Sequence, residues 1–247
     1  MRRQTTGRAI LNGLMLVLVL VVNGMAGSGA LSGRSIGDIA VDYPTYFLPA
    51  GYVFSIWGLI YLLLTGFVVY QATPAGRSDP SVGRVGTSWL INGALNMAWL
   101  VAFSYGQFVL AWVVMLGLLL SLLWIEINVS GQAEGPIARW LVALPFQVYL
   151  AWVSVATIAN TSQLLRYLGW DGGAFWSVIM MAVATALALA MLVRRSAFVF
   201  PLVVAWALAG IAIRYAAVPL LVYAAWGFVA VCLGGLAWMG THRARPA

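Results

Sequence analysis

Two stretches of the chain place flat aromatic rings and side-chain amides on one helical face. Residues three or four positions apart share a face of an α-helix. The first stripe consists of Asn92, Asn96 and Trp99, and the second of Tyr149, Trp152, Ala156 and Asn160. Rings and amides of this kind can build a mostly apolar pocket with a few polar fixing points, which suits binding rather than bond breaking. They can equally hold membrane helices together, so composition leaves pocket and helix packing open.

Patterns that would support catalysis or metal binding are scarce. His242 is the only histidine, Cys232 is the only cysteine, and HExxH, GxxxxGK and CxxC motifs are absent. A GxSxG motif surrounds Ser35, but its turn-rich segment lacks the strand-to-helix elbow that a nucleophile needs. Glu126 ends an apolar run, where an interfacial position is favoured over a buried one. We therefore predict no catalytic residue, no metal site and no enzyme activity, with Cys232 a small core residue.

The composition indicates that most of the surface faces lipid. Of 247 residues, 63% are hydrophobic and 8% are charged, whereas soluble domains carry about 25% charged residues. This disfavours a soluble enzyme and a disordered regulator. All thirteen basic residues are arginines that occur singly or in pairs, so the net charge of +7 does not indicate a nucleic-acid partner. The expected partner of this surface is the lipid bilayer.

Eight apolar runs approach the roughly 20 residues that a membrane-spanning helix needs. They lie near residues 10–27, 51–71, 87–105, 107–127, 137–161, 173–193, 197–214 and 217–239. The first run follows arginines and competes with a cleaved signal peptide, but Asn12 and Asn23 favour a helix packed against others. The predicted fold class is an all-α polytopic membrane protein with about eight transmembrane helices.

The arginines indicate the orientation, since positively charged loops stay on the cytoplasmic face. With eight spans and a cytoplasmic N-terminus, ten arginines fall on the cytoplasmic side and three on the other. The ten are Arg2, Arg3, Arg8, Arg77, Arg84, Arg139, Arg194, Arg195, Arg243 and Arg245, and the three are Arg34, Arg166 and Arg214. We predict a multi-pass protein of the cell (inner) membrane with both termini cytoplasmic and the segment 28–50 outside.

The twelve tryptophans fall into two groups. Six lie near span ends, where tryptophan anchors helices at the membrane interface: Trp89, Trp124, Trp140, Trp170, Trp176 and Trp238. Six lie at least one turn inside a span, where the indole N–H needs an acceptor or a ligand: Trp57, Trp99, Trp112, Trp152, Trp206 and Trp226. For each interior tryptophan taken alone, core packing is favoured over ligand binding.

Three motifs resemble one family. The stretch YPTYFLPAGYVFSIWGLIY begins at Tyr43, ALNMAW covers residues 94–99, and YLAWVSVATIAN covers residues 149–160. In this order they resemble the first loop and the second, third and fifth helices of the translocator protein family, also called TspO or tryptophan-rich sensory proteins. The resemblance extends over about residues 10–165 and implies a five-helix bundle over 1–165, followed by an additional three-helix segment over 166–247.

The resemblance also implies a site. Family members bind tetrapyrroles, sterols and aromatic drugs in a pocket lined by helices that include the second, third and fifth, under a lid formed by the first loop. The ligand-binding residues it implies, together with the second stripe, are Trp57, Tyr61, Asn96, Trp99, Tyr149, Trp152, Ala156 and Asn160, and the lid residues are Pro44, Tyr46 and Pro49.

The chain departs from the family pattern in places. Tyr46 stands where tryptophan is usual, and Leu48 and Gly51 replace a proline and a tryptophan, which weakens the lid motif. Val148 replaces a frequent proline, while Pro145 lies about a turn earlier, so the bend in the fifth helix is expected elsewhere. The stretches PFQVYLAW at 145–152 and PLLVYAAW at 219–226 are similar to each other, either as a transporter-like inverted repeat or, more simply, through convergence on a packing surface.

The leading hypothesis is a membrane binding or sensor protein for a flat apolar ligand, of which a tetrapyrrole such as a porphyrin is the class that the resemblance implies. No cofactor is required, and Arg34 is the nearest cation for porphyrin propionates. The alternatives are a secondary transporter of a small apolar or amphipathic metabolite and a non-catalytic subunit of a membrane complex. A homodimer is compatible with each.

Overall fold

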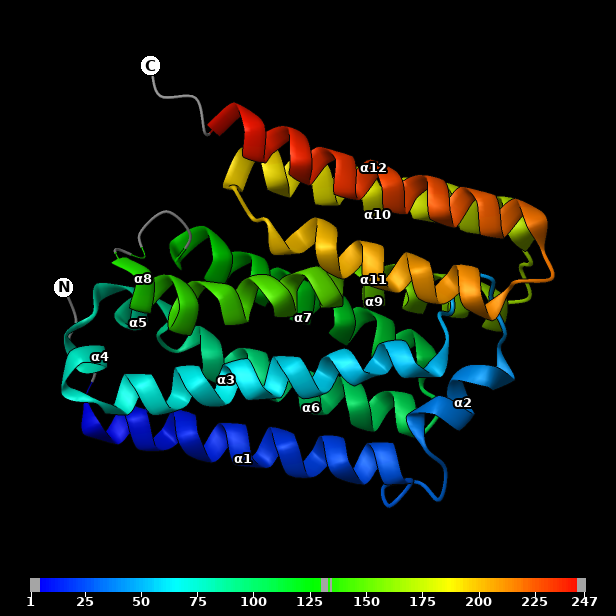
Figure 1. Ribbon diagram of the computed structural model, residues 1–247. Helices are drawn as coiled ribbons and strands as arrows, with labels where there is room; N and C mark the ends of the chain where they lie inside the picture. Colours follow the sequence, from blue (N-terminus) through cyan, green and yellow to red (C-terminus); the bar gives the residue numbers. More distant parts are fainter. Residues whose placement is uncertain (1–4, 130–132, 134, 244–247) are drawn as a thin grey trace. The chain divides into compact units, whose positions relative to one another are not determined.

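The computed structural model describes residues 5–129, 133 and 135–243. Within these residues the chain forms helices and their connections, without strands (Figure 1). Arg2, Arg3, Glu134 and Arg245, which entered the topology and loop predictions, lie outside the described residues.

The long helices lie where the apolar runs predicted them. Six helical stretches of the described residues are long and apolar enough to cross a membrane: Thr6–Ser28 (α1), Gly51–Ala72 (η1, Gly51–Ser55, and α3, Ile56–Ala72), Phe108–Val129 (α7), Gly135–Tyr167 (α8, η2 and α9), Gly173–Arg195 (α10) and Pro219–His242 (within α12, Pro219–Arg243). Helix α11 (Val199–Arg214) is apolar but shorter. The remaining predicted run forms α6 (Ser88–Ser104), with 17 residues. By the composition of its helices, the chain is a multi-pass membrane protein.

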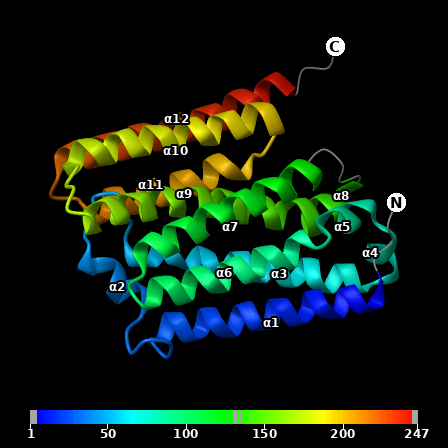
Figure 2. The same ribbon diagram turned by 180° about the vertical axis from the view of Figure 1, so that it is seen from behind.

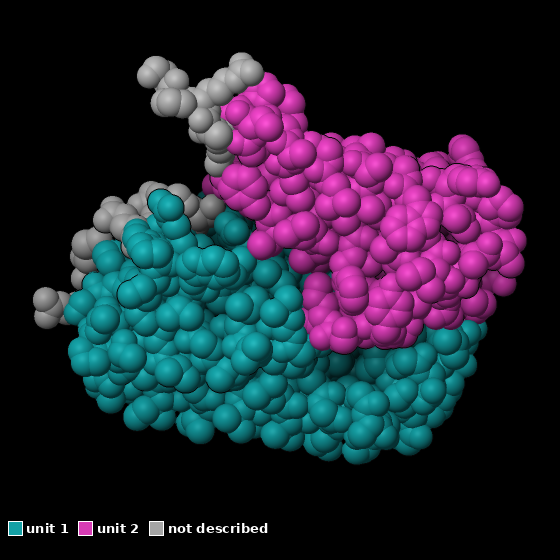
Figure 3. All heavy atoms as spheres, viewed as in Figure 1, with its two compact units in different colours: residues 1–42, 57–153 teal, residues 43–56, 154–247 magenta. Residues whose placement is uncertain are grey.

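The chain packs as two compact units, coloured separately in Figure 3. Unit 1 comprises residues 1–42 and 57–153, and unit 2 comprises residues 43–56 and 154–247. Each unit has its own core and is described by itself. The division that the resemblance implies, after residue 165, stays a prediction.

In unit 1, α6 packs against both α1 and α7, and Figures 1 and 2 show these helices side by side. Asn12 of α1 donates a hydrogen bond to the side chain of Gln71 (2.7 Å) and accepts one at its carbonyl from the indole of Trp89 (3.0 Å). Trp89 is buried against Phe67 and Phe146. The prediction that Trp89 anchors the membrane interface is therefore wrong, because its N–H has an acceptor inside the bundle. The asparagines of α1 do join it to other helices, as expected.

The fifth predicted helix is irregular at its start. It passes from α8 (Gly135–Ala138) through a π-helical turn, η2 (Arg139–Ala143), into α9 (Leu144–Tyr167). Pro145 has no N–H to donate, and its ring crowds the carbonyl four residues earlier. A π-turn is a common way to accommodate such a defect. The irregularity thus lies next to Pro145. This agrees with the prediction that the helix bends elsewhere than at Val148.

In unit 2, α12 packs against α10 and α11, and α10 also packs against α11. Small buried side chains allow close approach, among them Ala184 and Ala188 of α10 and Ala225 of α12. Cys232 of α12 is buried as well, which confirms the prediction of a small core residue.

The segment 43–56 lies on α11 within unit 2. The backbone N–H of Ala50 donates to the Gly210 carbonyl (3.1 Å), and the indole of Trp206 donates to the Val53 carbonyl (3.2 Å). Arg214 donates to the carbonyl of Pro49 (3.3 Å). Tyr215, just beyond α11, makes one more such bond, to a carbonyl of the segment, as described below. Four hydrogen bonds of the segment's backbone therefore go to α11 or to the residue that follows it.

The two similar octapeptides have opposite environments. Tyr149 and Trp152 of α9 are each 2% exposed, whereas Tyr223 and Trp226 of α12 are 78% and 48% exposed. In α9 the aromatic residues form core contacts, and in α12 the equivalent residues face outward. This difference supports neither a packing surface common to both octapeptides nor an inverted repeat with two equivalent binding halves.

Candidate functional site

The predicted aromatic residues of α3 and α9 form one cluster in unit 1. Trp57 stacks on Tyr61, with ring centroids 5.5 Å apart and an interplanar angle of 23°. The same indole meets Tyr149 edge-on at 5.7 Å and Trp152 at 6.3 Å. Tyr149 and Trp152 are buried, while Trp57 and Tyr61 are half-buried. Trp57 is therefore the centre of a four-ring cluster, called the aromatic cluster below.

Asn96 supplies the polar group of this cluster. Its side chain is fully buried, donates to the Tyr149 hydroxyl (2.9 Å) and accepts from the amide of Asn23 (2.9 Å). A chain of hydrogen bonds thus runs from α1 through α6 to α9. The sequence left two roles open for Asn96, helix packing and pocket formation. The observed hydrogen bonds show that Asn96 joins three helices, and the bond to Tyr149 places it beside the rings.

The other members of the first stripe have separate environments. Asn92 donates to the hydroxyl of Ser121 on α7 (2.9 Å), which is a helix-packing contact. Trp99 is buried and packs on Phe103 of its own helix, with centroids 5.6 Å apart. Asn92 therefore acts in helix packing, and Trp99 belongs to the core of α6.

The remaining predicted residues belong to unit 2. On α9, Asn160 donates to the carbonyl of Ala156 (3.0 Å), four residues earlier in the same helix. Of the predicted lid residues, Pro49 is buried and packs near Gly210, whereas Pro44 and Tyr46 line a cavity described below. The lid residues are thus part of the segment that rests on α11.

The segment 28–50 contains a short helix that the sequence did not predict, α2 (Ile36–Asp42). Ser35 caps it: the Ser35 hydroxyl accepts from the N–H of Asp38 (3.1 Å), and the Asp38 carboxylate accepts from the Ser35 N–H (3.1 Å). This reciprocal capping box stabilises a helix start. The hydrogen bond from the Ser35 hydroxyl also lowers the pKa of Asp38. The GxSxG motif is therefore a helix cap.

Arg34 is engaged in an ion pair. Its guanidinium donates to both carboxylate oxygens of Asp42, at 2.7 and 2.9 Å. These bonds lower the pKa of Asp42 and raise that of Arg34. The suggestion that Arg34 binds porphyrin propionates would require this pair to open.

Glu126 is buried, with 1% of its surface exposed, although it lies near the end of α7. The prediction of an interfacial position is wrong, because the side chain is packed within unit 1 and accepts a hydrogen bond from Gln147 of α9 (3.1 Å). An acidic group inside an apolar bundle is costly, and it is a functional candidate for that reason.

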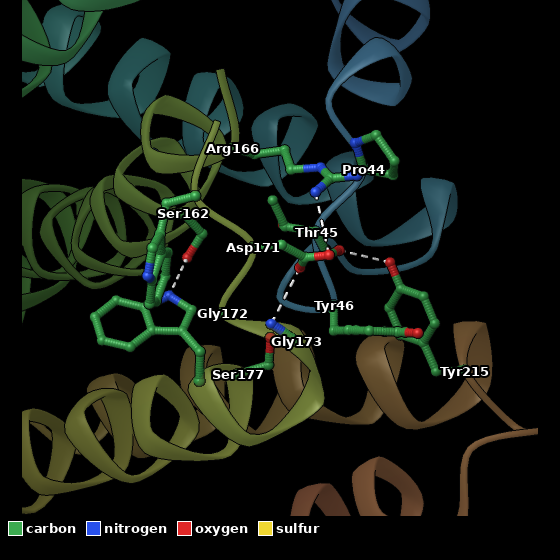
Figure 4. Close-up of a pocket in the computed structure, with 12 residues that line it drawn as sticks. Pro44, Thr45, Tyr46, Ser162, Arg166, Asp171, Gly172, Gly173, Ser177 and Tyr215 are labelled. Carbon is green, nitrogen blue, oxygen red and sulfur yellow. Dashed lines mark hydrogen bonds and ion pairs between the residues drawn. The ribbon is translucent and has the colours of Figure 1, made fainter. Parts of the chain in front are cut away.

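A cavity of about 230 Å³ lies entirely within unit 2 (Figure 4). Its lining comes from the end of α9, the connection to α10, the first turn of α10, the segment after α2 and Tyr215 beyond α11. The Tyr215 hydroxyl donates to the carbonyl of Thr45 (2.7 Å), and burial raises the pKa of Tyr215. Arg166 and Asp171 form an ion pair at 3.1 Å beside it.

Sequence analysis missed most of this cavity. Ser162, Trp170 and Trp176 lie in one stretch of the chain, 162–176, but Tyr215 lies beyond α11, and no spacing rule connects the two parts. The available signal was local: Arg166 and Asp171 carry opposite charges on either side of a glycine turn. Among the described residues, no group of three or more His, Cys, Asp or Glu side chains could hold a metal ion.

The helices and buried clusters define a class: a multi-pass, all-helical membrane protein with aromatic groups packed inside its bundle. A family model described as TSPO-like protein matches residues 9–238, and the chain belongs to the TSPO-like protein family. The match continues past residue 165, where the recognised motifs end, so the family pattern includes α10, α11 and most of α12. Neither the curated proteins nor the solved structures compared gave a match.

Proposed function

We propose that the protein binds a flat apolar ligand at the aromatic cluster of unit 1, and that the ligand is a tetrapyrrole. The observation that carries this proposal is the arrangement of Trp57, Tyr61, Tyr149 and Trp152 around one indole, with the buried Asn96 bonded to Tyr149. Membership of the TSPO-like family supports a binding or sensor role over catalysis.

The binding mode follows from how the rings are held. Trp57 and Tyr61 are half-buried, so their faces can be offered to a ligand without unpacking the bundle. A planar ligand would separate Trp57 from Tyr61 and stack against both rings, one on each of its faces. It would gain burial and stacking energy from these two contacts. Tyr149 and Trp152 are buried and form the fixed wall behind them. The ligand needs no metal coordination from the protein in this mode.

Protoporphyrin titration tests this proposal. Replacing both Trp57 and Trp152 with alanine should weaken protoporphyrin binding by at least about tenfold, since each aromatic pair contributes about 0.5–1.5 kcal/mol beyond burial. Binding is followed by the porphyrin absorption band as well as by tryptophan quenching, because the variant has fewer fluorophores.

The matched control is the double change Trp124→Ala and Trp140→Ala. These tryptophans belong to unit 1 but are 61% and 65% exposed, outside the cluster. The control should bind protoporphyrin like the unmodified protein. Unchanged affinity in the cluster variant, or equal losses in both variants, would remove the site assignment.

The proposal extends to the topology. All eight long helices cross the bilayer, α6 and α11 included, with five forming the bundle that carries the site over 1–165 and three following over 166–247. Both termini lie in the cytoplasm. The support is that each predicted apolar run is a helix and that the arginines divide unequally between the two faces.

Transport is a second candidate function, which the burial of Glu126 favours. Proton-coupled transporters use acidic groups inside the membrane, and Glu126 is a buried acidic group on an apolar helix of membrane-spanning length.

If protoporphyrin crosses the membrane with a proton, uptake into proteoliposomes should depend on an imposed pH gradient. Glu126→Gln, which keeps an acceptor for Gln147 but cannot release a proton, should abolish that dependence. Equal uptake in both proteins, or tight binding without uptake, would refute coupling through Glu126.

A further inference from the structure

The cavity in unit 2 is bounded by two aromatic pairs. Trp170 and Trp176 meet edge-to-face with centroids 4.9 Å apart, and Tyr46 and Tyr215 meet in the same way at 5.2 Å. In Figure 4, Arg166 and Asp171 lie between Ser162 on one side and Tyr215 on the other. The walls are therefore aromatic, and the polar groups lie between them. This is the usual composition of a small-molecule site.

The charges of the cavity cancel. Arg166 is paired with Asp171, and the other Asp171 oxygen accepts from the N–H of Gly173 at the start of α10 (3.1 Å). The positive charge and the helix N-terminus, which could attract an anion, are thus already satisfied by this carboxylate. A ligand that leaves these bonds intact must be uncharged.

Two hydroxyl groups belong to residues that line the cavity. The Ser162 hydroxyl is already engaged, because it donates to the carbonyl of Ile158 (3.1 Å) and accepts from the indole N–H of Trp176 (3.3 Å). The buried Thr45 hydroxyl beside the cavity has no hydrogen-bond partner among the described residues. A buried hydroxyl without a partner is costly, and a ligand that bonds to it recovers that cost.

The volume limits the ligand's size. Pockets for drug-sized molecules span about 300–1,000 Å³, whereas a cavity of about 150 Å³ accepts benzene. At about 230 Å³, this cavity matches a molecule of one or two fused rings and is too small for a tetrapyrrole. It therefore differs in ligand class from the aromatic cluster of unit 1.

We propose that this cavity is a second binding site, specific for uncharged, flat aromatic molecules of one or two rings that carry an N–H or O–H group. The rings of Tyr46 and Trp176 hold the ligand's faces or edges, and the Thr45 hydroxyl accepts its hydrogen bond. The site is formed within unit 2 and is independent of the function proposed for unit 1.

Fluorine NMR with 5-fluoroindole tests this site on the full-length protein in detergent. The fluorine resonance should shift saturably as protein is added. Tyr46→Ala, which removes a wall residue that is 38% exposed, should weaken binding by at least about fivefold. Thr45→Val, which removes the hydroxyl at nearly constant volume, should weaken binding of 5-fluoroindole. The same change should not alter the binding of 1-fluoronaphthalene, because this probe has no N–H to donate to the Thr45 hydroxyl.

The controls separate this site from others. Tyr223→Ala removes an exposed tyrosine of unit 2 that does not line the cavity, and it should bind 5-fluoroindole normally. The double variant Trp57→Ala, Trp152→Ala should also bind it normally, even if it loses protoporphyrin. The proposal is overturned by non-saturable shifts, by normal binding in Tyr46→Ala, by equal effects of Thr45→Val on both probes, or by loss of binding in either control.

Discussion

Replacing Gly210 with alanine should release the segment 43–56 from α11. A β-carbon at this position would lie 2.2 Å from a methyl group of Val53 and 3.2 Å from the β-carbon of Pro49. Val53 is fully buried and β-branched, so its methyl cannot rotate away cheaply. We expect a loss of about 1–3 kcal/mol of stability, the usual cost of overpacking. Faster hydrogen exchange at the Ala50 amide, which donates to the Gly210 carbonyl, would report the release directly.

Gly227→Ala on α12 is the matched control, because a β-carbon there has no atom outside its own helix within 4 Å. Alanine is the better helix former, so this change should leave stability unchanged or slightly raised. If the Ala50 amide exchanges at the same rate in Gly210→Ala as in Gly227→Ala, the close contact with α11 does not stabilise the segment 43–56.

Asn96→Leu should destabilise unit 1 by about 1–3 kcal/mol. The change removes the amide that donates to the buried Tyr149 hydroxyl, and it removes the oxygen that accepts from the Asn23 amide. Because the cost arises mainly from a buried polar group left unsatisfied, removing that group should recover part of it. The double variant Asn96→Leu, Tyr149→Phe should therefore be less destabilised than the sum of the two single changes.

Thermal or denaturant unfolding in detergent measures this double-mutant cycle. Asn128→Leu is the control, since Asn128 bonds only back to the Trp124 carbonyl of its own helix among the contacts described. Strict additivity in the cycle, or an equal loss in Asn128→Leu, would show that the Asn23–Asn96–Tyr149 chain contributes nothing specific.

Hydropathy predicted the long helices well because apolar length is a one-dimensional property. Each predicted run coincides with a helix, and even the tight break between α6 and α7 is observed. The short α2 was missed because its stability comes from the Ser35–Asp38 capping box rather than from an apolar face. The burial of Glu126 was missed for a related reason, since its hydrogen bond to Gln147 joins two helices.

Two kinds of signal predicted residues of the candidate site. Spacing placed Tyr149 and Trp152 on one helix face, and the family resemblance implied Trp57, from another helix, in the same site. The structure adds the geometry, in which Trp57 contacts both rings. The unit 2 cavity was not predictable, because it joins the segment after α2 to residues beyond α9 and α11. Such long-range juxtapositions depend on helix packing, which leaves no periodic signal in the chain.

The way segment 43–56 is fastened has a consequence for its variability. The carbonyls of Thr45, Pro49 and Val53 accept the hydrogen bonds that hold it, from Tyr215, Arg214 and Trp206. Backbone carbonyls are present whatever side chains the segment carries. Substitutions such as Tyr46, Leu48 and Gly51 can therefore accumulate without loosening the attachment. The segment can thus acquire a new chemical preference while α11 keeps its main-chain course constant.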